Sequence, residues 1–404
     1  MQEDTGFDVA VVGAGPIGAA TARHLADRGA RVLIVGPAEP PDFAGHDGVW
    51  SGHYDQGRLG HVLEVPLVAA LLAARSIRRF GELARRTGVE FTRPVHSLAV
   101  MPAALDGGTP SEWFDLGRLV RNAEDVGQPV EHLSEARLRE RYPHLTFEPG
   151  HECVVQRDAF IVNPRDLTTA ELAAATAAGA TLVRDEITAI AADGPRRRLT
   201  ARSGTSWTAD TVVVATGAST NAGGLLPRRL AMDTLGATVV LIEVPGPEAV
   251  DLPGIMYYKQ RGEELLYGGI VMTPLRYPDG RWYIKCSGTS LLDNPLGTRD
   301  EIAAWVRTGG AEDDIAPALT LLRELLPAET AAALGPARVR PCLVSTNHTG
   351  HPYIDHADEN VVVVVEGERG VMAADELGRL TASLAATGRW SDGLPHQLFR
   401  AEWT

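Results

Sequence analysis

Hydrophobic residues near the start of the chain occur in two patterns. Residues 9–12 form an uninterrupted apolar run, and Ile17, Thr21 and Leu25 then lie on one face at helical spacing. A second strand-like run covers residues 31–35. An uninterrupted apolar run is typical of a strand buried on both faces, and a spacing of three to four residues is typical of a helix. The succession predicts a strand–helix–strand unit with parallel strands.

The same two patterns continue to the end of the chain. The expected helices cover residues 67–83, 165–178, 299–308, 316–326 and 373–387, and short strands with a small helix are expected between 91 and 155. The expected strands cover residues 181–184, 187–191, 211–214, 238–244, 254–259, 265–269, 282–286 and 360–365. Buried strands of the first type therefore occur at both ends and in the middle, separated by β-rich segments.

The turn between the first strand and the first helix is rich in glycine. It reads Gly13-Ala14-Gly15-Pro16-Ile17-Gly18, a G-x-G-x-x-G pattern. Gly13 permits a tight turn, Gly15 lets the backbone approach a pyrophosphate, and Gly18 lets the helix pack on the strand. Pro16 suits the first turn of a helix, whose amides and dipole then face the phosphates. In this context the pattern predicts a bound dinucleotide.

One position departs from the usual dinucleotide site. The adenosine ribose is normally held by an acidic residue at the end of the second strand. Near that position the chain has Gly36, followed by Pro37, and Glu39 is the nearest carboxylate. We therefore expect backbone groups or Glu39 to hold the adenosine.

The dispersal of these elements favours FAD over NAD, because NAD-dependent dehydrogenases usually keep their nucleotide fold contiguous. We expect an α/β protein with a discontinuous Rossmann-type FAD-binding domain and an α+β substrate domain built on a β-sheet. The FAD-binding domain is assigned to residues 1–94, 151–225 and 336–404, and the substrate domain to residues 95–150 and 226–335.

Composition and charge argue against several classes of protein. A net charge of −14 over 404 residues disfavours nucleic acid and anionic membrane surfaces as partners. No apolar run reaches the ~18 residues of a membrane span, and we expect no signal peptide before the first strand. The three cysteines form no CxxC pair, and His348, His351 and His356 lack metal-ligand spacing. We expect a cytoplasmic monomer without a metal site.

Three further segments carry a resemblance to a known family. They are the loop from Ser51 to Arg58, the turn Ala215-Thr216-Gly217 and the glycine loop of residues 367–370. With the first glycine turn they resemble the D-amino-acid-oxidase-like flavoproteins, above all monomeric sarcosine oxidase, N-methyltryptophan oxidase and pipecolate oxidase. The similarity extends over nearly the whole chain, and it implies an FAD cofactor.

The resemblance implies roles for residues around the flavin. Arg58 matches an arginine that lies against the flavin ring, where a fixed cation stabilises the anionic reduced form. Lys285 matches a lysine near flavin N5, where a compact positive charge assists oxygen reduction. Only one other lysine, Lys259, occurs among the 38 basic residues, which favours a specific role for Lys285. His53 matches a loop histidine, and Tyr267 matches an active-site tyrosine.

The resemblance also implies a covalent link to the cofactor. Cys342 falls where sarcosine oxidases attach FAD through a cysteine thioether, and His351 supports the register. The alternative is a cysteine that packs as a small buried hydrophobe. The residues expected to bind the cofactor are Gly13, Gly15, Pro16, Ile17, Gly18, Ser51, His53, Arg58, Ile187, Ala215, Gly217, Cys342, Gly367, Gly370 and Met372.

At several positions the chain departs from the family. The lysine that binds the substrate carboxylate falls on Ala374, a tyrosine on Val344, a histidine on Thr289, and a second loop arginine on His61. A buried carboxylate without a cation is costly. We therefore expect a substrate that is uncharged or larger than sarcosine, or one whose carboxylate is held by another arginine such as Arg369.

These features predict an FAD-dependent oxidase of a secondary or cyclic amine. The α-carbon of the neutral amine would lose a hydride to flavin N5, giving an imine, and O2 would be reduced to hydrogen peroxide. Lys285 would activate oxygen, Arg58 would tune the flavin and Tyr267 would line the substrate side. The alternatives are a flavin dehydrogenase that passes electrons to a carrier, a non-catalytic flavoprotein and an NAD enzyme. The lost carboxylate-binding groups favour natural-product tailoring over catabolism.

Overall fold

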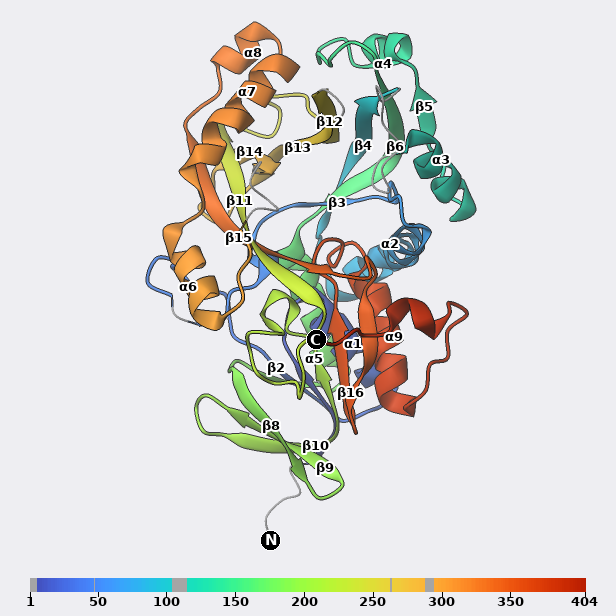
Figure 1. Ribbon diagram of the computed structural model, residues 1–404, viewed down its shortest axis with the longest axis vertical. Coiled ribbons are helices and arrows are strands. Elements are labelled where there is room, and N and C mark those ends of the chain that lie inside the picture. The colour runs from blue at the N-terminus through green and yellow to red at the C-terminus, as the bar shows by residue number, and fades with distance from the viewer. Residues whose placement is uncertain (1–5, 47, 104–114, 262–263, 288–293) are drawn as a thin grey trace.

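Two β-sheets organise the chain (Figure 1). The computed structural model describes residues 6–46, 48–103, 115–261, 264–287 and 294–404, apart from the side chains of residues 260, 261 and 264–268. Sheet A contains β1 (Gly6–Val12), β2 (Val32–Val35), β7 (Thr181–Val183), β8 (Ile187–Asp193), β9 (Arg196–Ala201), β10 (Ser206–Val214), β16 (Tyr353–Asp358) and β17 (Val361–Val365). Its strands run in the order β16-β17-β10-β1-β2-β7, and β8 and β9 extend beside β10.

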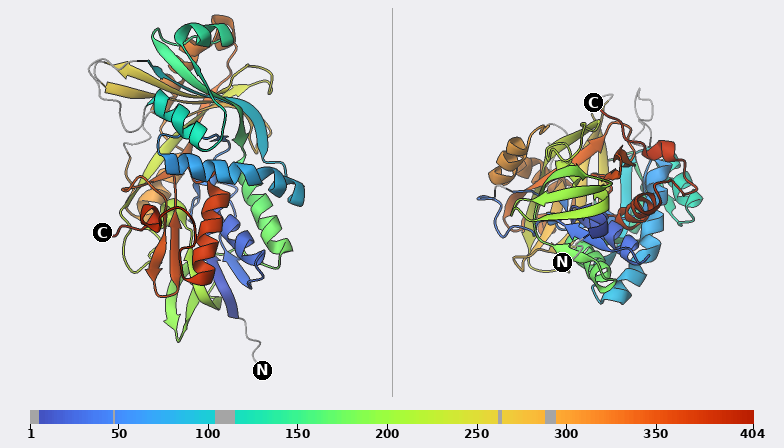
Figure 2. Two further views of the ribbon diagram at one scale, coloured as in Figure 1. Left: turned by 90° about the vertical axis from the view of Figure 1, so that its right-hand side faces the viewer. Right: turned by 90° about the horizontal axis from the view of Figure 1, so that it is seen from below.

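The central strands of sheet A are parallel, as the first strand–helix–strand unit predicted. β1 pairs in parallel with β2 on one side and with β10 on the other, and β17 continues the parallel arrangement beyond β10. These strands are almost entirely buried valine, leucine, isoleucine and alanine, which is typical of parallel strands covered on both faces. Three helices cover one face: α1 (Pro16–Ala26), α5 (Pro164–Ala177) and α9 (Ala374–Thr387) (Figure 2).

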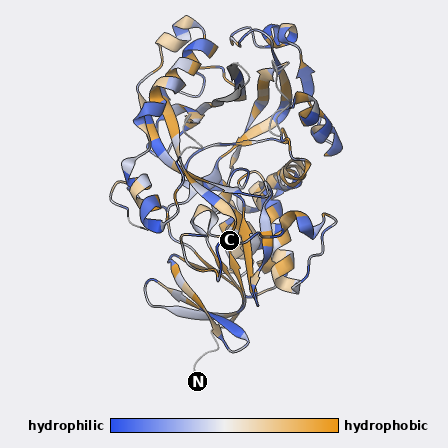
Figure 3. Cartoon of the chain, in the orientation of Figure 1, coloured by the Kyte–Doolittle hydropathy of each residue, from blue (hydrophilic) through white to orange (hydrophobic). Residues whose placement is uncertain are grey.

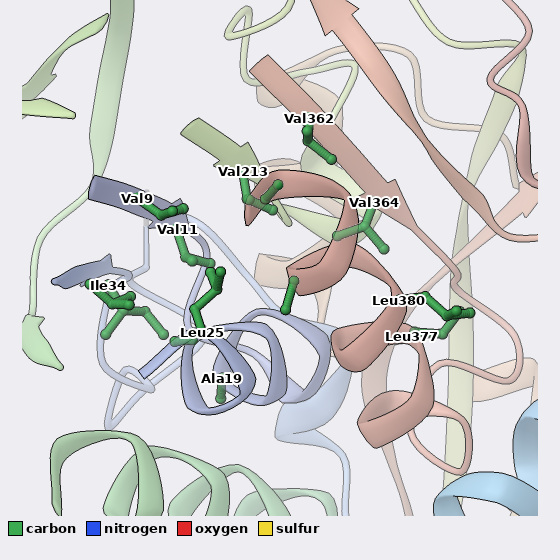
Figure 4. Packing of buried hydrophobic residues seen from close by; sticks show 14 of the residues in the cluster. Val9, Val11, Ala19, Leu25, Ile34, Val213, Val362, Val364, Leu377 and Leu380 are labelled. Atoms are coloured by element: carbon green, nitrogen blue, oxygen red, sulfur yellow. The ribbon is translucent and has the colours of Figure 1, made fainter. Parts of the chain in front are cut away.

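The core under these helices joins segments from both ends of the chain. Val9, Val11 and Ile34 of the sheet meet Leu25 of α1, and Leu377 and Leu380 of α9 complete the cluster (Figure 4). α1 and α9 lie unusually close, because a Cβ at Gly378 would come within 2.7 Å of the Ala20 backbone. The hairpin β8–β9 and the C-terminal residues cover the opposite face of sheet A.

Sheet B contains segments from most of the chain. Its strands are β3 (Arg58–Gly60), β4 (Thr92–Pro102), β5 (Glu131–Leu133), β6 (His151–Val162), β11 (Met232–Val244), β12 (Gly254–Arg261), β13 (Glu264–Arg276), β14 (Trp282–Ser287) and β15 (Ala337–Asn347). They run in the order β15-β11-β14-β13-β12-β4-β6-β3, with β5 paired to β6. All neighbours are antiparallel except β12 and β4.

The two faces of sheet B have different neighbours. On one face Val240, Ile242 and Ile284 pack against α7 (Ile315–Leu325). On the other face Ala237, Val239 and Leu241 pack in a separate cluster with Met272 and Cys342. Alternation along β11 therefore separates a helix-covered face from a face that looks into the molecule.

The remaining helices lie around the two sheets. They are α2 (Leu67–Thr87), α3 (Leu116–Asp125), α4 (Glu135–Arg141), α6 (Arg299–Thr308) and α8 (Ala328–Ala332), with 3-10 turns at Gly52–Tyr54, Gly217–Ser219, Glu312–Asp314 and His396–Phe399. Figure 3 shows hydrophobic colour along the strands of both sheets and hydrophilic colour over much of α3 and α4. Within the described part of the chain, none of the helices combines the length and the apolar character of a membrane span.

Most of the predicted elements agree with the structure, and the expectation of an α/β fold is confirmed. β9 was not predicted, because its sequence Arg-Arg-Arg-Leu-Thr-Ala carries a single large apolar residue. The proposed domain division stays a prediction. β3, β6 and β15 fall in segments assigned to the FAD-binding domain, and they pair within sheet B. The chain therefore crosses repeatedly between the two sheets.

Candidate functional site

A cavity of about 1250 Å³ lies between the two sheets. The carboxyl ends of β1, β2 and β10 open into it, which is where ligands bind in parallel α/β sheets. The face of sheet B that points inward forms the opposite wall. The volume exceeds the ~300–1,000 Å³ usual for a single small ligand, so the cavity has room for a dinucleotide together with a substrate.

The glycine turn has the geometry that a pyrophosphate requires. Gly13 has φ +109°, and a Cβ there would lie 2.3 Å from the carbonyl oxygen of Ala215. Gly15 is the extended N-cap of α1, no side chain caps this helix, and Pro16 occupies its first turn. Gly13, Gly15, Pro16 and Ala215 line the cavity, so the first amides of α1 are available to an anion there.

Ile17 and Gly18, at the end of the turn, have different roles. Ile17 lines the cavity. Gly18 does not, because it lies under the turn, where a Cβ would come within 1.9 Å of the carbonyl oxygen of Gly13. Gly18 therefore serves close packing of helix on strand, as the pattern predicted.

The absence of an acidic residue at position 36 has a steric cause. A Cβ on Gly36 would lie 2.5 Å from the amide nitrogen of Ala14, because β2 ends directly against the glycine turn. Glu39 lines the same end of the cavity, and Arg165 holds its carboxylate with two contacts of 2.7 Å. Ile187 lines this end as well.

Asp55 joins the two cations expected at the flavin. Its Oδ2 accepts hydrogen bonds from Lys285 Nζ and from Arg58 Nη1, each at 2.5 Å. Lys285 also donates to the carbonyl oxygen of Gly57 at 2.8 Å, and Tyr277 donates to Asp55 Oδ1 at 3.1 Å. The structure therefore brings Lys285 and Arg58 together through a residue to which the sequence analysis gave no role.

The pKa values of Asp55 and Lys285 depend on both burial and neighbouring charges. Burial raises the pKa of Asp55, but Lys285 and Arg58 outweigh it, and the net shift is downward. The pKa of Lys285 is lowered by burial and by Arg58, and Asp55 offsets only part of that. Asp55 is therefore ionised at neutral pH, and it is the main group that favours the charged form of Lys285.

Cys342 lies beside the same cluster. Its side chain is 5% exposed, lines the cavity, and has its Sγ 3.8 Å from Arg58 Nη2. Burial raises the pKa of this thiol, and the Arg58 guanidinium counteracts part of the shift. Cys342 is thus the cysteine next to the cations, whereas Cys153 and Cys286 are buried away from the cavity lining.

Ser51 and His53 form a pair near the glycine turn. Ser51 Oγ lies 2.5 Å from His53 Nδ1, and the imidazole approaches Gly15. Burial, and then the charges of Arg165 and Arg58, lower the pKa of His53 to about 3. His53 is therefore neutral at physiological pH, and it can act there as a hydrogen-bonding group.

The C-terminal loop and β15 complete this wall. Gly217, Gly367 and Gly370 line the cavity, and a Cβ on Gly367 would meet the backbone oxygen of Ser345 at 2.3 Å. Ser345 Oγ and Asn347 Oδ1 are buried without a hydrogen-bond partner among the described residues, and both residues line the cavity. Unsatisfied buried polar atoms beside a glycine cradle fit a polar cofactor.

Met372 lies outside the lining. Its side chain is buried in an apolar cluster with Val62 and Ala70. Ala374 is also fully buried, in a different apolar cluster. Val344 lines the cavity, and the position of Thr289 lies outside the described residues.

The inward face of sheet B forms an apolar wall. Met256 pairs with Ala99 of β4 and with Ile270 of β13, and Met272 pairs with Lys285 of β14. All five line the cavity. Tyr267 lies in β13, paired with Tyr258, but its side chain is outside the described part of the structure. Tyr258 lines the cavity, and its pKa is raised by burial and by Glu64.

A second ionic cluster lies at this end of the cavity. Arg369 Nε donates to Glu64 Oε2 at 2.6 Å, and Arg369 Nη1 donates to Glu368 at 2.9 Å. His61 is bonded to Ser97 Oγ at 2.9 Å, and burial lowers its pKa. Arg369 and His61 were named from the sequence, whereas Glu64 was not. Across the described residues, no three histidine, cysteine, aspartate or glutamate side chains gather as metal ligands would.

The family of the chain follows from this fold and from comparison with known proteins. A family model described as FAD dependent oxidoreductase (DAO) matches residues 8–384. The chain therefore belongs to this family and is an oxidoreductase, which confirms the resemblance found in the sequence. The glycine cradle, the uncapped amides of α1 and the unpaired polar atoms of β15 fit the cofactor of that family.

Individual relatives are distant. The chain is 26% identical to glycine oxidase of Geobacillus kaustophilus over 390 residues, which cover 94% of this chain and 92% of that protein. It is 31% identical to monomeric sarcosine oxidase of Streptomyces avermitilis over 180 residues, so this match spans only 44% of that relative. N-Methyl-L-tryptophan oxidase of Yersinia pestis is 27% identical over 37% of each chain.

Two solved structures show the same fold. The open form of NikD, an unusual amino acid oxidase essential for nikkomycin biosynthesis, matches with a TM-score of 0.75 at 20% identity. Glycine oxidase of Geobacillus kaustophilus matches with a TM-score of 0.71 at 21% identity. Each comparison covers 98% of both chains.

Proposed function

We propose that this chain is an FAD-dependent oxidase of a secondary or cyclic amine, which forms an imine and reduces O2 to hydrogen peroxide. The proposal rests above all on the placement of Lys285. Lys285 lies on the cavity side of sheet B, near Arg58 and Cys342, and it lines the same cavity as the glycine turn. Bound FAD supplies the chemistry, by accepting a hydride equivalent from the amine and passing two electrons to O2.

The residues present divide the cavity into three regions. The glycine turn, Glu39 and Ile187 would hold the adenosine diphosphate part of FAD. Arg58 and Cys342, with Ser345 and Asn347, would surround the flavin. The wall of sheet B would then face the substrate. It contains Met101, Met256 and Met272, whose flexible side chains adapt to a substrate larger than sarcosine.

Lys285 would hold a positive charge where negative charge develops on oxygen. Two of its three N–H groups are used by Asp55 and by the carbonyl of Gly57, which fixes the ammonium in position. A compact charge held in a buried site stabilises a developing anion more strongly than the same charge in water.

The same geometry gives some support to the second candidate, a dehydrogenase that passes its electrons to a carrier. Asp55 Oδ2 lies 2.5 Å from Lys285 Nζ, and this anion opposes the field that the ammonium would exert on oxygen. The two candidates differ in the rate at which O2 reoxidises the reduced protein.

The test is the substitution Lys285→Met. We expect reoxidation by O2, followed by stopped-flow absorbance, to slow by about two orders of magnitude, a loss of ~3 kcal/mol of transition-state stabilisation. Reduction by amine under anaerobic conditions should persist. Lys259→Met is the matched control, because Lys259 is also buried in sheet B but pairs with Glu148 and Glu324 away from the cavity lining. Unchanged reoxidation in Lys285→Met would leave the dehydrogenase as the better candidate.

We also propose that FAD is attached covalently through Cys342. The Sγ atom lines the cavity next to Arg58, and a guanidinium favours the thiolate. The thiolate would bond to the 8α-carbon, which would lose a proton, and the two electrons released would reduce the flavin and then pass to O2. Acid precipitation should leave the yellow colour in the pellet of the wild type. Cys342→Ala should release the colour into the supernatant, and Cys286→Ala, a buried cysteine outside the lining, should keep it in the pellet. A colourless wild-type pellet would contradict the proposal.

The biological setting belongs to the same proposal. Ala374 stands where the resembled family has the lysine that binds the substrate carboxylate, which favours a tailoring step in natural-product biosynthesis over breakdown of a simple amino acid. A cytoplasmic location, a monomeric state and the two-domain division remain predictions.

A further inference from the structure

We propose that Glu64 is a substrate-binding carboxylate that selects amines lacking a carboxylate group. This inference rests on the proposed amine-oxidising function and narrows its substrate class. The substrate would be an amine with an apolar body, bound through an N–H to Glu64 and recognised better as the free amine than as the corresponding amino acid.

Glu64 is positioned to meet a substrate. Its neighbours Leu63 and Val65 pack with Ala99 and Met101 of the apolar wall, and Glu64 itself lines the cavity with its side chain 11% exposed. Oε2 accepts the hydrogen bond from Arg369. Oε1 lies 3.8 Å from His61 Nε2, which is too far for a hydrogen bond, so this oxygen keeps acceptor capacity toward the cavity.

The cations near the apolar wall already have carboxylate partners. Arg369 is paired with Glu64 and Glu368, and Lys285 and Arg58 share Asp55. Burial lowers the pKa of His61, so the imidazole that replaces the family arginine is neutral at physiological pH. A substrate carboxylate beside Glu64 would therefore meet an Arg369 that two carboxylates already neutralise.

The loop that carries Arg369 adds further negative charge. Glu366 lines the cavity and accepts the backbone N–H groups of Glu368 and Arg369, each at 3.0 Å. The charge of Glu64 is enough to balance the charge of Arg369. The additional carboxylates of Glu366 and Glu368 therefore give the cluster a net negative charge. Negative charge in a partly buried site attracts the N–H of an amine and repels a carboxylate.

The first experiment uses wild-type holoenzyme and pairs of compounds that differ only by a carboxylate. One pair is N-methylphenethylamine with N-methyl-L-phenylalanine, and another is piperidine with pipecolic acid. Anaerobic bleaching of the flavin reports reduction by each compound. We expect the amine of at least one pair to reduce the flavin at least tenfold faster, at equal concentration, than its amino acid.

The second experiment uses Glu64→Gln, which keeps the shape but removes the charge. Loss of this charge leaves Arg369 less neutralised, so the amine-over-amino-acid ratio of kcat/KM should fall by about tenfold, the size expected for one charge-assisted hydrogen bond. Glu140→Gln is the control, because Glu140 is an exposed partner of Arg137 far from the lining. It should leave the ratio unchanged.

The possible outcomes distinguish a failure of this inference from a failure of the proposed function. Reduction by amino acids but not by the matching amines would overturn the inference and leave the oxidase intact. An unchanged ratio in Glu64→Gln, with full flavin content, would remove Glu64 from substrate selection. Flavin that no amine or amino acid reduces would instead overturn the proposed function.

Discussion

At the scale of single residues, Asp55 controls the charge on Lys285. Its carboxylate raises the pKa of this lysine by charge and by a hydrogen bond, with a smaller effect in the same direction from Cys342, against burial and Arg58, which lower it. In Asp55→Asn the pKa of Lys285 should therefore fall further. Because the ammonium form exists only below that pKa, the pH at which oxygen reactivity declines should move downward.

The measurement is the pH profile of flavin reoxidation in Asp55→Asn and wild type. The wild-type rate should decrease as pH rises through the lowered pKa of Lys285, and the variant should decrease at lower pH. A merely structural role of Asp55 would reduce the rate at every pH without moving the profile. Tyr277→Phe is the milder control: it removes the hydrogen bonds to Asp55 Oδ1 at 3.1 Å and to the Gln56 carbonyl at 3.3 Å but keeps the carboxylate, and it should leave the position of the profile nearly unchanged.

Individual site residues could be predicted where a backbone requirement or a family motif marks them. Gly13 and Gly18 were predictable because only glycine fits at those positions, and Lys285 stood out because lysine is otherwise almost absent. Glu64 was not predictable, because its partner Arg369 lies 305 positions further along the chain. Asp55 lies in the loop from Ser51 to Arg58 that carries the family resemblance. Its role, however, depends on β14, which brings Lys285 beside it.

At the scale of elements, alternation decides which side chains reach the site. Along β14, Lys285 faces the cavity, whereas Ile284 and Cys286 pack toward α7. The sequence predicted the strand, but the choice of face came from pairing with Met272 on β13 and Leu241 on β11. A shift of one residue in this register would bury Lys285 against the helix, so the presence of its ammonium in the cavity depends on this register.

Gly36 illustrates the same limit at the end of β2. From the sequence it was a missing acidic residue. In the fold, β2 ends so close to the glycine turn that a Cβ at position 36 would lie 2.5 Å from the amide nitrogen of Ala14. Such close approaches depend on how two elements pack, and a pattern within either element does not reveal them.

At the scale of the whole molecule, a buried ionic network ties together helices from four parts of the chain. Arg23 of α1 donates to Glu171 of α5 at 2.5 Å and to Asp375 of α9 at 2.8 Å, and Arg79 of α2 donates to Asp375 at 2.6 Å. Glu171 and Asp375 are at most 1% exposed. The network joins the helices that cover sheet A to one another and to α2, so it holds α9, near the end of the chain, against α1, near its start.

Removal of Arg23 should therefore destabilise the fold. Arg23→Met leaves two buried carboxylates with less compensation, a change that typically costs about 3–5 kcal/mol. Urea unfolding of the variant and wild type measures it. Arg31→Met is the matched control, because its ion pair with Asp8 is exposed and should be worth about 0–1 kcal/mol. Equal losses in both variants would contradict a stabilising network.

The pH dependence provides a second check on the same network. Burial raises the pKa of Glu171 to about 7, and the Arg23 charge limits that shift. A carboxyl whose pKa is raised in the folded state favours folding most when it is protonated, and this contribution is lost as pH rises through the folded pKa. Without Arg23 the pKa of Glu171 should rise further. The stability deficit of Arg23→Met should therefore be larger at pH 8 than at pH 5.5, whereas the deficit of Arg31→Met should not grow over this range.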